Sequence, residues 1–210
     1  MPNLLHYEKL ARKEGFLRVA GVDEAGRGPL AGPVVACACI IPYGVFFPLV
    51  NDSKQLSPKL REELFLELTS HPKVEYGIGI VSHEEIDRIN IARATEKAML
   101  EACSKLASSP DLLLVDGVKL PHPTVPHKKI IKGDTLSHSI AAASILAKVT
   151  RDRIMVELDT LFPGYGFKSH KGYGTEAHLK ALSELGPCAI HRKSFAPVVQ
   201  ACLRSSLSLI

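Results

Sequence analysis

Blocks of apolar and polar residues alternate along the chain and predict strands and helices in turn. Two runs rich in β-branched residues, Leu17 to Asp23 and Val34 to Ile41, predict strands. A short turn rich in glycine and proline joins them, so we expect an antiparallel pair. Residues 74–81 predict a third strand, which would complete a three-stranded meander.

Helical patterns occupy the segments around these strands. An N-terminal helix is expected before residue 17. Ser57 followed by Pro58 predicts a helix start. Ser82 with Glu85 resembles a capping box, and we expect it to open one helical stretch that reaches about residue 107.

The second half adds two more strands and a long helix. Residues 111–115 (DLLLV) form a continuous apolar run, which is typical of a central buried strand. A fifth strand leads to residues 132–134, and residues 137–162 predict a long helix with small residues on one face. Two shorter helices follow a loop rich in glycine and basic residues. The pattern therefore predicts an α/β fold.

Composition narrows the class of protein. With 210 residues and 46% hydrophobic content, the chain can form one globular unit with a well-filled core. The five cysteines are scattered without a CxxC pair, which argues against a disulfide framework or a zinc ribbon. No apolar run suits a membrane span or a signal peptide, so we expect a cytoplasmic protein and, by default, a monomer.

The distribution of charge says more than the net charge of +4. Residues 1–125 carry 14 Lys and Arg against 16 Asp and Glu, whereas residues 126–210 carry 12 against 6. The second half is therefore the basic half. Such an asymmetry suggests a polyanionic partner, although solvated surface lysines explain it about as often.

Four acidic residues lie where predicted strands end. Asp23 and Glu24 follow the first strand, Asp116 ends the fourth, and Asp134 follows the fifth. A single Asp beside a glycine is more often a turn former, but three strand ends that each carry acid suggest one cluster. Clustered carboxylates stay ionised only if cations screen them, and oxygen ligands suit Mg²⁺ or Mn²⁺.

The glycine-rich turn has a second interpretation. Residues 26–31 (GRGPLA) fit the dinucleotide-binding pattern GxGxxG/A and follow a strand. That motif requires a helix after the turn, whereas here a second strand-like run follows. The same glycines would also let a backbone approach a sugar-phosphate chain closely, because no Cβ is in the way.

Taken together, these motifs resemble bacterial ribonuclease HII, the type 2 ribonuclease H. The resemblance runs from GVDEAGRGPLAGPVV through DSKQLS, LLVDG, IIKGD, SIAAASILAKVTRDR and SHKGYGT to HRKSFAPV, and so covers nearly the whole chain. It implies a ribonuclease H-like fold with a mixed five-stranded sheet flanked by helices. It also implies a catalytic domain at 1–160 and a C-terminal helical extension at 161–210 that contributes to substrate binding and is packed as part of one unit.

The resemblance further implies a metal-dependent endonuclease. Such an enzyme cleaves RNA in RNA/DNA hybrids and incises duplex DNA on the 5′ side of a single embedded ribonucleotide, leaving 3′-hydroxyl and 5′-phosphate ends. By the family pattern, the two metals are held by four acids: Asp23, Glu24, Asp116 and Asp134. One metal would activate the attacking water, and the other would stabilise the leaving 3′-oxygen.

Substrate-binding residues also follow from the resemblance. The backbone of Gly26, Arg27 and Gly28, together with the phenol of Tyr173, would detect the 2′-hydroxyl that distinguishes RNA from DNA. Ser53 and Lys54 match a motif that lies near the substrate backbone. Further basic candidates for phosphate contacts are Lys148, Arg151, Lys168, His170, Lys171, Arg192 and Lys193.

Three other polar residues are left outside the metal set. The spacing of Asp152 suits an ion pair with Lys148 one helical turn earlier. The histidines show no paired zinc spacing, so His138 and His191 are expected to be structural or to lie near the substrate.

Two functions outside the nuclease class remain open at this point. A non-catalytic nucleic-acid-binding module would explain the basic half but not the acids at three strand ends. An oxidoreductase with a nucleotide cofactor would require a strand, a turn and a helix around Gly26. A related nuclease or transposase with the same sheet is the nearest enzymatic alternative.

Overall fold

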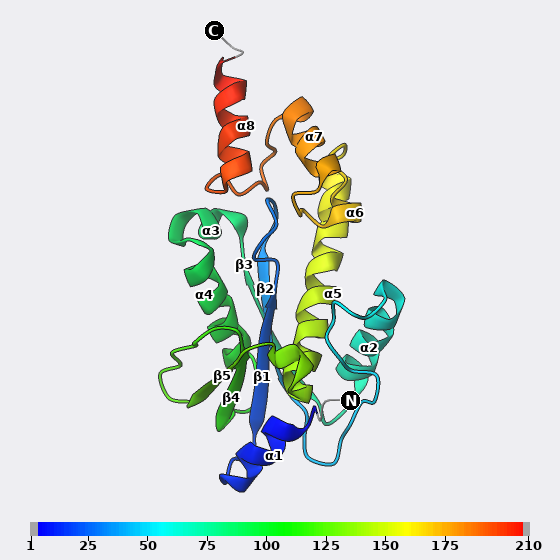
Figure 1. Cartoon of the computed structure of the whole chain (residues 1–210), viewed down its shortest axis with the longest axis vertical. Helices are drawn as coiled ribbons and strands as arrows, with labels where there is room; N and C mark the ends of the chain where they lie inside the picture. The colour runs from blue at the N-terminus through cyan, green and yellow to red at the C-terminus, as the bar shows by residue number, and fades with distance from the viewer. Residues whose placement is uncertain (1–3, 208–210) are drawn as a thin grey trace.

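A mixed five-stranded sheet forms the frame of the molecule in the computed structural model, which describes residues 4–207 (Figure 1). The strand order is β3-β2-β1-β4-β5. The first three strands form an antiparallel meander, and β4 and β5 add to it in parallel. The strands are β1 (Val19–Ala25), β2 (Val34–Ile40), β3 (Glu75–Val81), β4 (Leu112–Asp116) and β5 (His127–Ile130). The predicted α/β class and the meander are confirmed.

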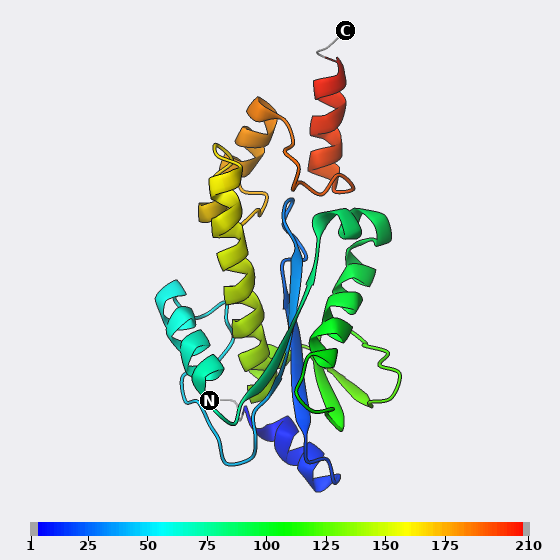
Figure 2. The ribbon, with the colours of Figure 1, turned by 180° about the vertical axis from the view of Figure 1, so that it is seen from behind.

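Helices cover both faces of this sheet (Figures 1 and 2). One face is covered by α3 and α4, and the other by α5 with α2 beside it, while α6 to α8 extend beyond the end of β1 and β2. The helices are α1 (His6–Lys13), α2 (Pro58–Ser70), α3 (His83–Ile89), α4 (Ile91–Ser104), α5 (His138–Leu161), α6 (Phe167–His170), α7 (Glu176–Leu185) and α8 (Ala196–Leu207), with a short 3₁₀ helix η1 at Gly133–Thr135.

The core is divided between the two faces by the alternation of side chains along each strand. Ala20 and Val22 of β1 pack in the same cluster as Met99 of α4. On the opposite face, Cys37 of β2 packs with Leu64 of α2 and with the alanines of α5. The buried thiols of the sheet therefore serve as small apolar side chains.

Helix α5 lies unusually close to β1, and Gly21 makes this approach possible. A Cβ atom at this position would stand 2.1 Å from the carbonyl carbon of Ser139 and 2.2 Å from the amide nitrogen of Ile140. The small residues Ala141, Ala142 and Ala143 continue the contact and are fully buried. The predicted small-residue face of the helix is thus the face that meets the sheet.

The structure corrects two predicted boundaries. The single helical stretch expected after Ser82 is two helices, because Asn90 adopts a φ of 67° between α3 and α4. The side-chain oxygen of Asn90 accepts hydrogen bonds from the amides of Ala92 and Arg93, at 3.0 and 3.1 Å, and so starts α4. The first strand is β1, which begins and ends two residues later than predicted.

The C-terminal region also differs from the prediction. Instead of two helices after residue 162, the structure has three, because the short α6 precedes α7 and α8. Ala31 of the β1–β2 link pairs with His191, so this region is joined directly to the sheet. Within residues 4–207, none of the helices has the length and apolar character needed to cross a membrane.

Replacing Gly21 by Ala should destabilise the protein by about 3 kcal/mol, since the added methyl would push α5 away from β1. The measurement is the free energy of unfolding in urea. Gly44→Ala is the control, because Gly44 has a positive φ of 86° but nothing within 4 Å of its virtual Cβ. That control should cost only about 1 kcal/mol. Equal losses in the two variants would contradict the close approach.

Candidate active site

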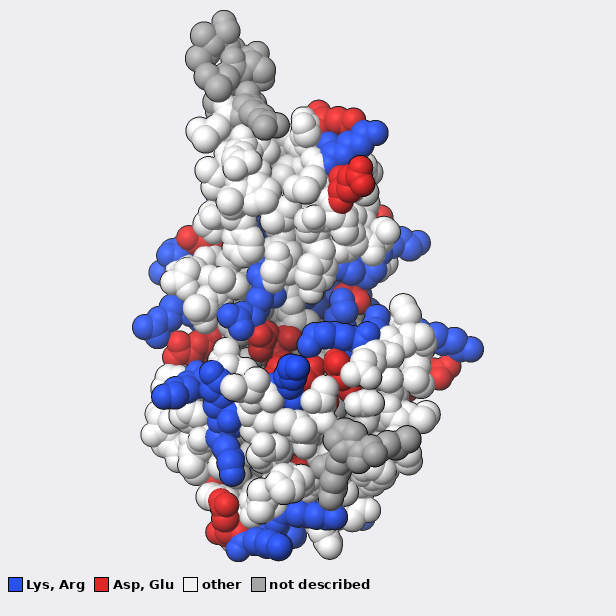
Figure 3. Space-filling model, in the orientation of Figure 1, with Lys and Arg blue, Asp and Glu red and all other residues white. Residues whose placement is uncertain are grey.

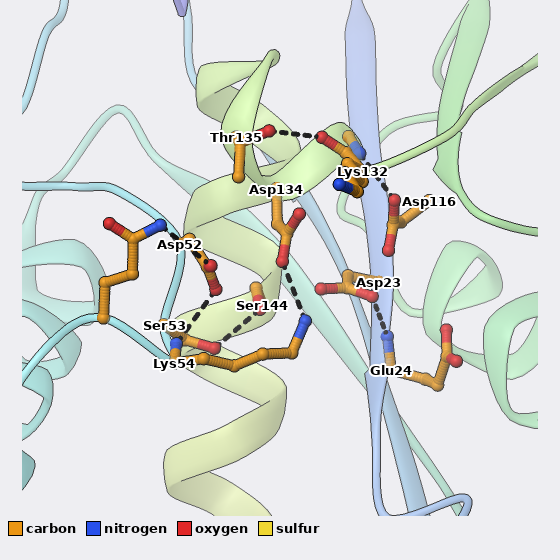
Figure 4. A network of polar contacts seen from close by, with 12 residues as sticks. Asp23, Glu24, Asp52, Ser53, Lys54, Asp116, Lys132, Asp134, Thr135 and Ser144 are labelled. Atoms are coloured by element: carbon orange, nitrogen blue, oxygen red, sulfur yellow. Dashed lines mark hydrogen bonds and ion pairs between the residues drawn. The ribbon is translucent and has the colours of Figure 1, made fainter.

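Three aspartates from separate segments meet on the α5 side of the sheet. Asp23 lies in β1, Asp116 ends β4, and Asp134 lies in η1 just before α5. One carboxylate oxygen from each residue can be chosen so that all three atoms lie within 4.8 Å of one another. Figure 4 shows these side chains around one space. The clustering predicted from the strand ends is therefore found for three of the four acids.

The fold explains why these three converge. Strand alternation places Asp23 on the same side of β1 as Gly21, so its carboxylate faces α5. Strands β1 and β4 run parallel, which brings Asp116 to the corresponding edge. The amide of Gly133 donates a 2.6 Å hydrogen bond to Asp116 Oδ1 and so links this strand end to η1, which carries Asp134.

Glu24 is not a member of this three-residue group. As the next residue in β1, it projects to the opposite side of the strand from Asp23 (Figure 4). Its Oε1 accepts a 3.3 Å hydrogen bond from Arg27, whereas its buried Oε2 has no hydrogen-bond partner among the residues described. Glu24 was expected to follow the strand, so this alternation was not predicted.

Burial and nearby negative charge disfavour the ionised forms of Asp23, Glu24 and Asp116. Burial raises the pKa of Asp23 well above its ordinary value, and the charges of Glu24 and Asp116 raise it further. Burial likewise raises the pKa of Asp116 and of Glu24, although Arg27 opposes the shift at Glu24. A cation placed between the carboxylates would reverse this effect.

Lys54 supplies part of the missing positive charge. Its Nζ donates a 3.0 Å hydrogen bond to Asp134 Oδ2. Asp52 fixes the loop by accepting a hydrogen bond from the Lys54 amide at 2.9 Å. Ser53 shares a 2.9 Å hydrogen bond with Ser144 of α5, whose hydroxyl lies beside Asp23 (Figure 4). Ser53 and Lys54 were predicted from the sequence, whereas Asp52 and Ser144 were not. The only signal for Ser144 is that it is a polar residue within the run of small residues.

The residues present fit a hard divalent cation. All the donors are carboxylate oxygens, which suit Mg²⁺ or Mn²⁺. The unpaired, buried Oε2 of Glu24 is a further oxygen available nearby. On the face shown in Figure 3, acidic side chains lie at mid-height in a hollow, with basic side chains around them.

A groove of about 690 Å³ lies between α2, α5 and the segment around the end of α6, and it begins one turn of α5 after Ser144. Four of the residues predicted to contact the substrate line it: Lys148, His170, Lys171 and Tyr173. Tyr173 is 41% exposed. A Cβ on Gly28 would lie 3.9 Å from Cε1 of the Tyr173 ring, so the glycine-rich turn and Tyr173 are neighbours in space.

The lysines of this groove already have partners within the protein. Lys148 donates a 2.7 Å hydrogen bond to Asp152, as the helical spacing predicted. Burial lowers the pKa of Lys148, and Asp152 opposes that shift. Lys171 donates to the backbone carbonyl of Lys168.

Two of the predicted phosphate contacts are wrong. Arg151 and Arg192 have no exposed surface, so neither can touch a phosphate. Their guanidinium groups donate to backbone carbonyls of the turn instead. Burial lowers the pKa of Arg151 to about 10 and that of Arg192 to about 9. A basic residue in a helix, such as Arg151, resembles a surface side chain, so its burial could not be predicted from the sequence.

Two histidines support the backbone at Tyr173. The amide of Cys188 donates to His191 Nδ1 at 3.0 Å, so His191 carries its proton on Nε2. That proton faces His178 Nε2 at 3.1 Å, and His178 Nδ1 then donates to the Tyr173 carbonyl at 2.9 Å. The two rings form one chain, and each ring is neutral.

The predicted roles of the other histidines resolve in the same way. His138 is buried and accepts a hydrogen bond from the Phe47 amide at 3.2 Å. His170 lies 2.7 Å from the Tyr165 carbonyl and accepts from the Gly172 amide at 3.2 Å. Both are structural, as is His191. Lys168 and Lys193 are exposed.

The local fold excludes a dinucleotide site at the glycine-rich turn. Residues 26–33 lead into β2 and not into a helix, so no helix N-terminus is available for a pyrophosphate. The acidic cluster and the basic residues around it therefore do not form part of a dinucleotide-binding site.

The sequence of the chain matches the family model for ribonuclease HII over residues 20–198. The chain belongs to the ribonuclease HII family. It is thus a type 2 ribonuclease H, the class of enzyme that cleaves RNA in RNA/DNA hybrids, and not a non-catalytic binding module. It is 57% identical to the ribonuclease HII of Chlamydia pneumoniae over 200 residues, which are 95% of this chain and 93% of the relative. With that of Chlamydia abortus the identity is 59% over 194 residues, covering 92% and 91%.

Solved structures share the fold of this chain. The ribonuclease H2 from Pyrococcus horikoshii OT3 matches with a TM-score of 0.75 and 28% identity, covering 89% of this chain and 98% of that one. Bst-RNase HIII, solved in complex with Mn²⁺, matches with a TM-score of 0.65 and 17% identity, covering 94% and 73%. The predicted ribonuclease H-like fold is confirmed.

Asp23→Asn should stabilise the metal-free protein at pH 7 by about 1–3 kcal/mol. The raised pKa of Asp23 means that its stabilising contribution holds below the ordinary value of 3.8 and is lost as the pH rises. An amide removes that cost, and thermal melting in EDTA measures the change. Asp159→Asn, outside the cluster, should change stability by less than about 0.5 kcal/mol. A lower melting temperature for Asp23→Asn would refute the repulsion.

The histidine chain predicts a loss of stability in acid. Burial lowers the pKa of His191 to about 4 and also lowers that of His178. The unfolded chain therefore binds more protons than the folded one as the pH falls from about 6.5 to 4, so stability declines over that range. His191→Gln should reduce this slope by up to about 1.4 kcal/mol per pH unit, measured by urea unfolding at each pH. His6→Gln, at an exposed position, should leave the slope unchanged.

Proposed function

We propose that this ribonuclease H also incises duplex DNA on the 5′ side of a single embedded ribonucleotide, leaving 3′-hydroxyl and 5′-phosphate ends. The convergence of Asp23, Asp116 and Asp134 carries the proposal, because such a cluster needs divalent cations. The position of Tyr173 beside Gly28 supports the recognition of a ribonucleotide.

The cations would be Mg²⁺ or Mn²⁺, held by Asp23, Asp116 and Asp134, with Glu24 reaching them from the other side of β1. When bound, they supply an activated water and charge stabilisation for the leaving 3′-oxygen. The chain itself contributes the orientation of its carboxylates: the Gly133 amide holds Asp116, and Lys54 holds Asp134. Lys54 would also approach the scissile phosphate, because its side chain is largely exposed.

Recognition of the substrate would divide between two elements. The backbone of Gly26, Arg27 and Gly28 would contact the 2′-hydroxyl, and the ring of Tyr173 would pack on the neighbouring deoxyribose. Ser53, Lys54, Lys148 and Lys171 would contact the phosphate backbone. The 2′-hydroxyl would decide between a ribonucleotide and a deoxyribonucleotide, because the two sugars differ only in this group.

The C-terminal part, residues 161–210, would contribute to substrate binding as an extension of a catalytic part at 1–160. The two parts share a core, in which Ala31 packs with Met155, Phe167 and Ile190. This shared packing supports a single unit.

Asp116→Asn should lower metal-dependent incision of a duplex with one embedded ribonucleotide by at least about 100-fold, as expected when several kcal/mol of charge stabilisation are lost. Binding of the duplex should be largely retained. The assay maps the cut site with and without Mg²⁺ and includes an all-DNA duplex of the same sequence. Asp159→Asn should cleave like the wild type. Incision of the all-DNA duplex, or full activity of Asp116→Asn, would overturn the proposal.

A further inference from the structure

Two buried arginines lie beneath the glycine-rich turn, and neither has a role in the proposed cleavage reaction. Arg151 comes from α5, and Arg192 from the segment between α7 and α8. Both side chains have no exposed surface. Every hydrogen bond recorded for their guanidinium groups runs to a backbone carbonyl. Burying a cation costs free energy, and here these hydrogen bonds to the backbone compensate for that cost.

The arginines act on the carbonyl groups of residues 26–33. Arg192 donates to the carbonyls of Gly26, Arg27, Gly32 and Pro33, at 2.6 to 3.1 Å. Arg151 donates to those of Ala31 and Pro33 at 3.1 and 2.9 Å. The Arg192 amide also donates to the Leu30 carbonyl at 2.8 Å. Six of the eight carbonyls in this turn are therefore drawn inward.

The amides of the exposed residues Arg27 and Gly28 are the part of the turn that remains available to a ligand. Within residues 4–207, no acceptor is recorded for either of them, whereas the amides of Leu30 and Gly32 donate to Gly172 and Ile190. A turn whose carbonyls face inward can present amides to a ligand oxygen without a competing acceptor. A hydroxyl or phosphate oxygen of a ribonucleotide is such a ligand.

Arg151 also ties this turn to the segment that carries Tyr173. Its Nη1 donates to the Lys171 carbonyl at 3.0 Å, and its guanidinium carbon lies 5.8 Å from the centre of the Tyr173 ring. Gly26 makes room for this arrangement, since a Cβ there would lie 2.0 Å from Arg151 Nε. One side chain thus fixes the distance between Gly28 and Tyr173.

We propose that Arg151 and Arg192 are positioning residues for ribonucleotide recognition, which hold the Arg27 and Gly28 amides open and at a set distance from Tyr173. This inference rests on the proposed function. It assigns the two arginines to the choice between ribose and deoxyribose, and not to overall affinity for nucleic acid, because neither can reach a phosphate.

The test compares binding of two duplexes that differ in one 2′-hydroxyl. In the cleavage-deficient Asp116→Asn protein, we expect at least about tenfold tighter binding of the duplex with one ribonucleotide than of the all-DNA duplex. Adding Arg192→Lys keeps the charge but loses the forked donor, and should lower that ratio to below about twofold. Affinity for the all-DNA duplex and for Mn²⁺ should not change. Arg88→Lys, at an exposed arginine of α3, should keep the full ratio.

The outcomes separate this inference from the function on which it rests. A parent protein without any preference overturns both. A parent with the preference, together with Arg192→Lys that retains it, overturns the inference alone, as does an equal loss of affinity for both duplexes. If Arg192→Lys does not melt cooperatively, Arg151→Lys takes its place. In ¹⁵N-glycine spectra of the Asp116→Asn protein, the Gly28 amide should shift with the ribonucleotide duplex only, and its failure to shift contradicts the open amide.

Discussion

The close contact between α5 and β1 is the constraint on which the site depends. Gly21 allows the first turn of α5 to lie against the strand, and two residues later Asp23 faces the same helix. The same contact places Ser144 beside Asp23 and sets η1, with Asp134, at the start of the helix. The acids meet because two elements with little side-chain bulk between them are pressed together. The packing of the core therefore determines the positions of the clustered carboxylates.

Most of this could be predicted from the sequence, and the exceptions have physical reasons. Runs of β-branched residues predicted the first two strands, and a continuous apolar run predicted the fourth. Acids at the strand ends predicted the cluster. The end of β1 was placed at Asp23 because Glu24 is a poor strand former, whereas the ladder to β2 extends over Glu24 and Ala25. That shift hid the strand alternation, which places Glu24 on the opposite side of β1 from Asp23. Asn90 divides the predicted helix because its backbone has a positive φ and its side chain caps α4. The helix propensity of the residues on either side does not reveal this break.

The buried arginines mark the limit of sequence reasoning more sharply. Arg151 and Arg192 lie in a basic half of the chain, and charge alone suggested contact with phosphate. Their burial depends on a surplus of backbone carbonyls that only the folded turn creates. The positive half of the chain is thus divided between exposed cations, such as Lys168 and Lys193, and buried cations that hold the backbone in place, such as Arg151 and Arg192.

The hydrogen-bond chain from Cys188 to Tyr173 has a direction, because a backbone donor begins it and a backbone acceptor ends it. Neither ring can turn over alone without setting two donors or two acceptors against each other. The imidazoles of His178 and His191 consequently behave as a single polar unit, and evolution would have to exchange them as a pair. A substitution at one of these two positions would break the hydrogen-bond chain unless the other position changed as well.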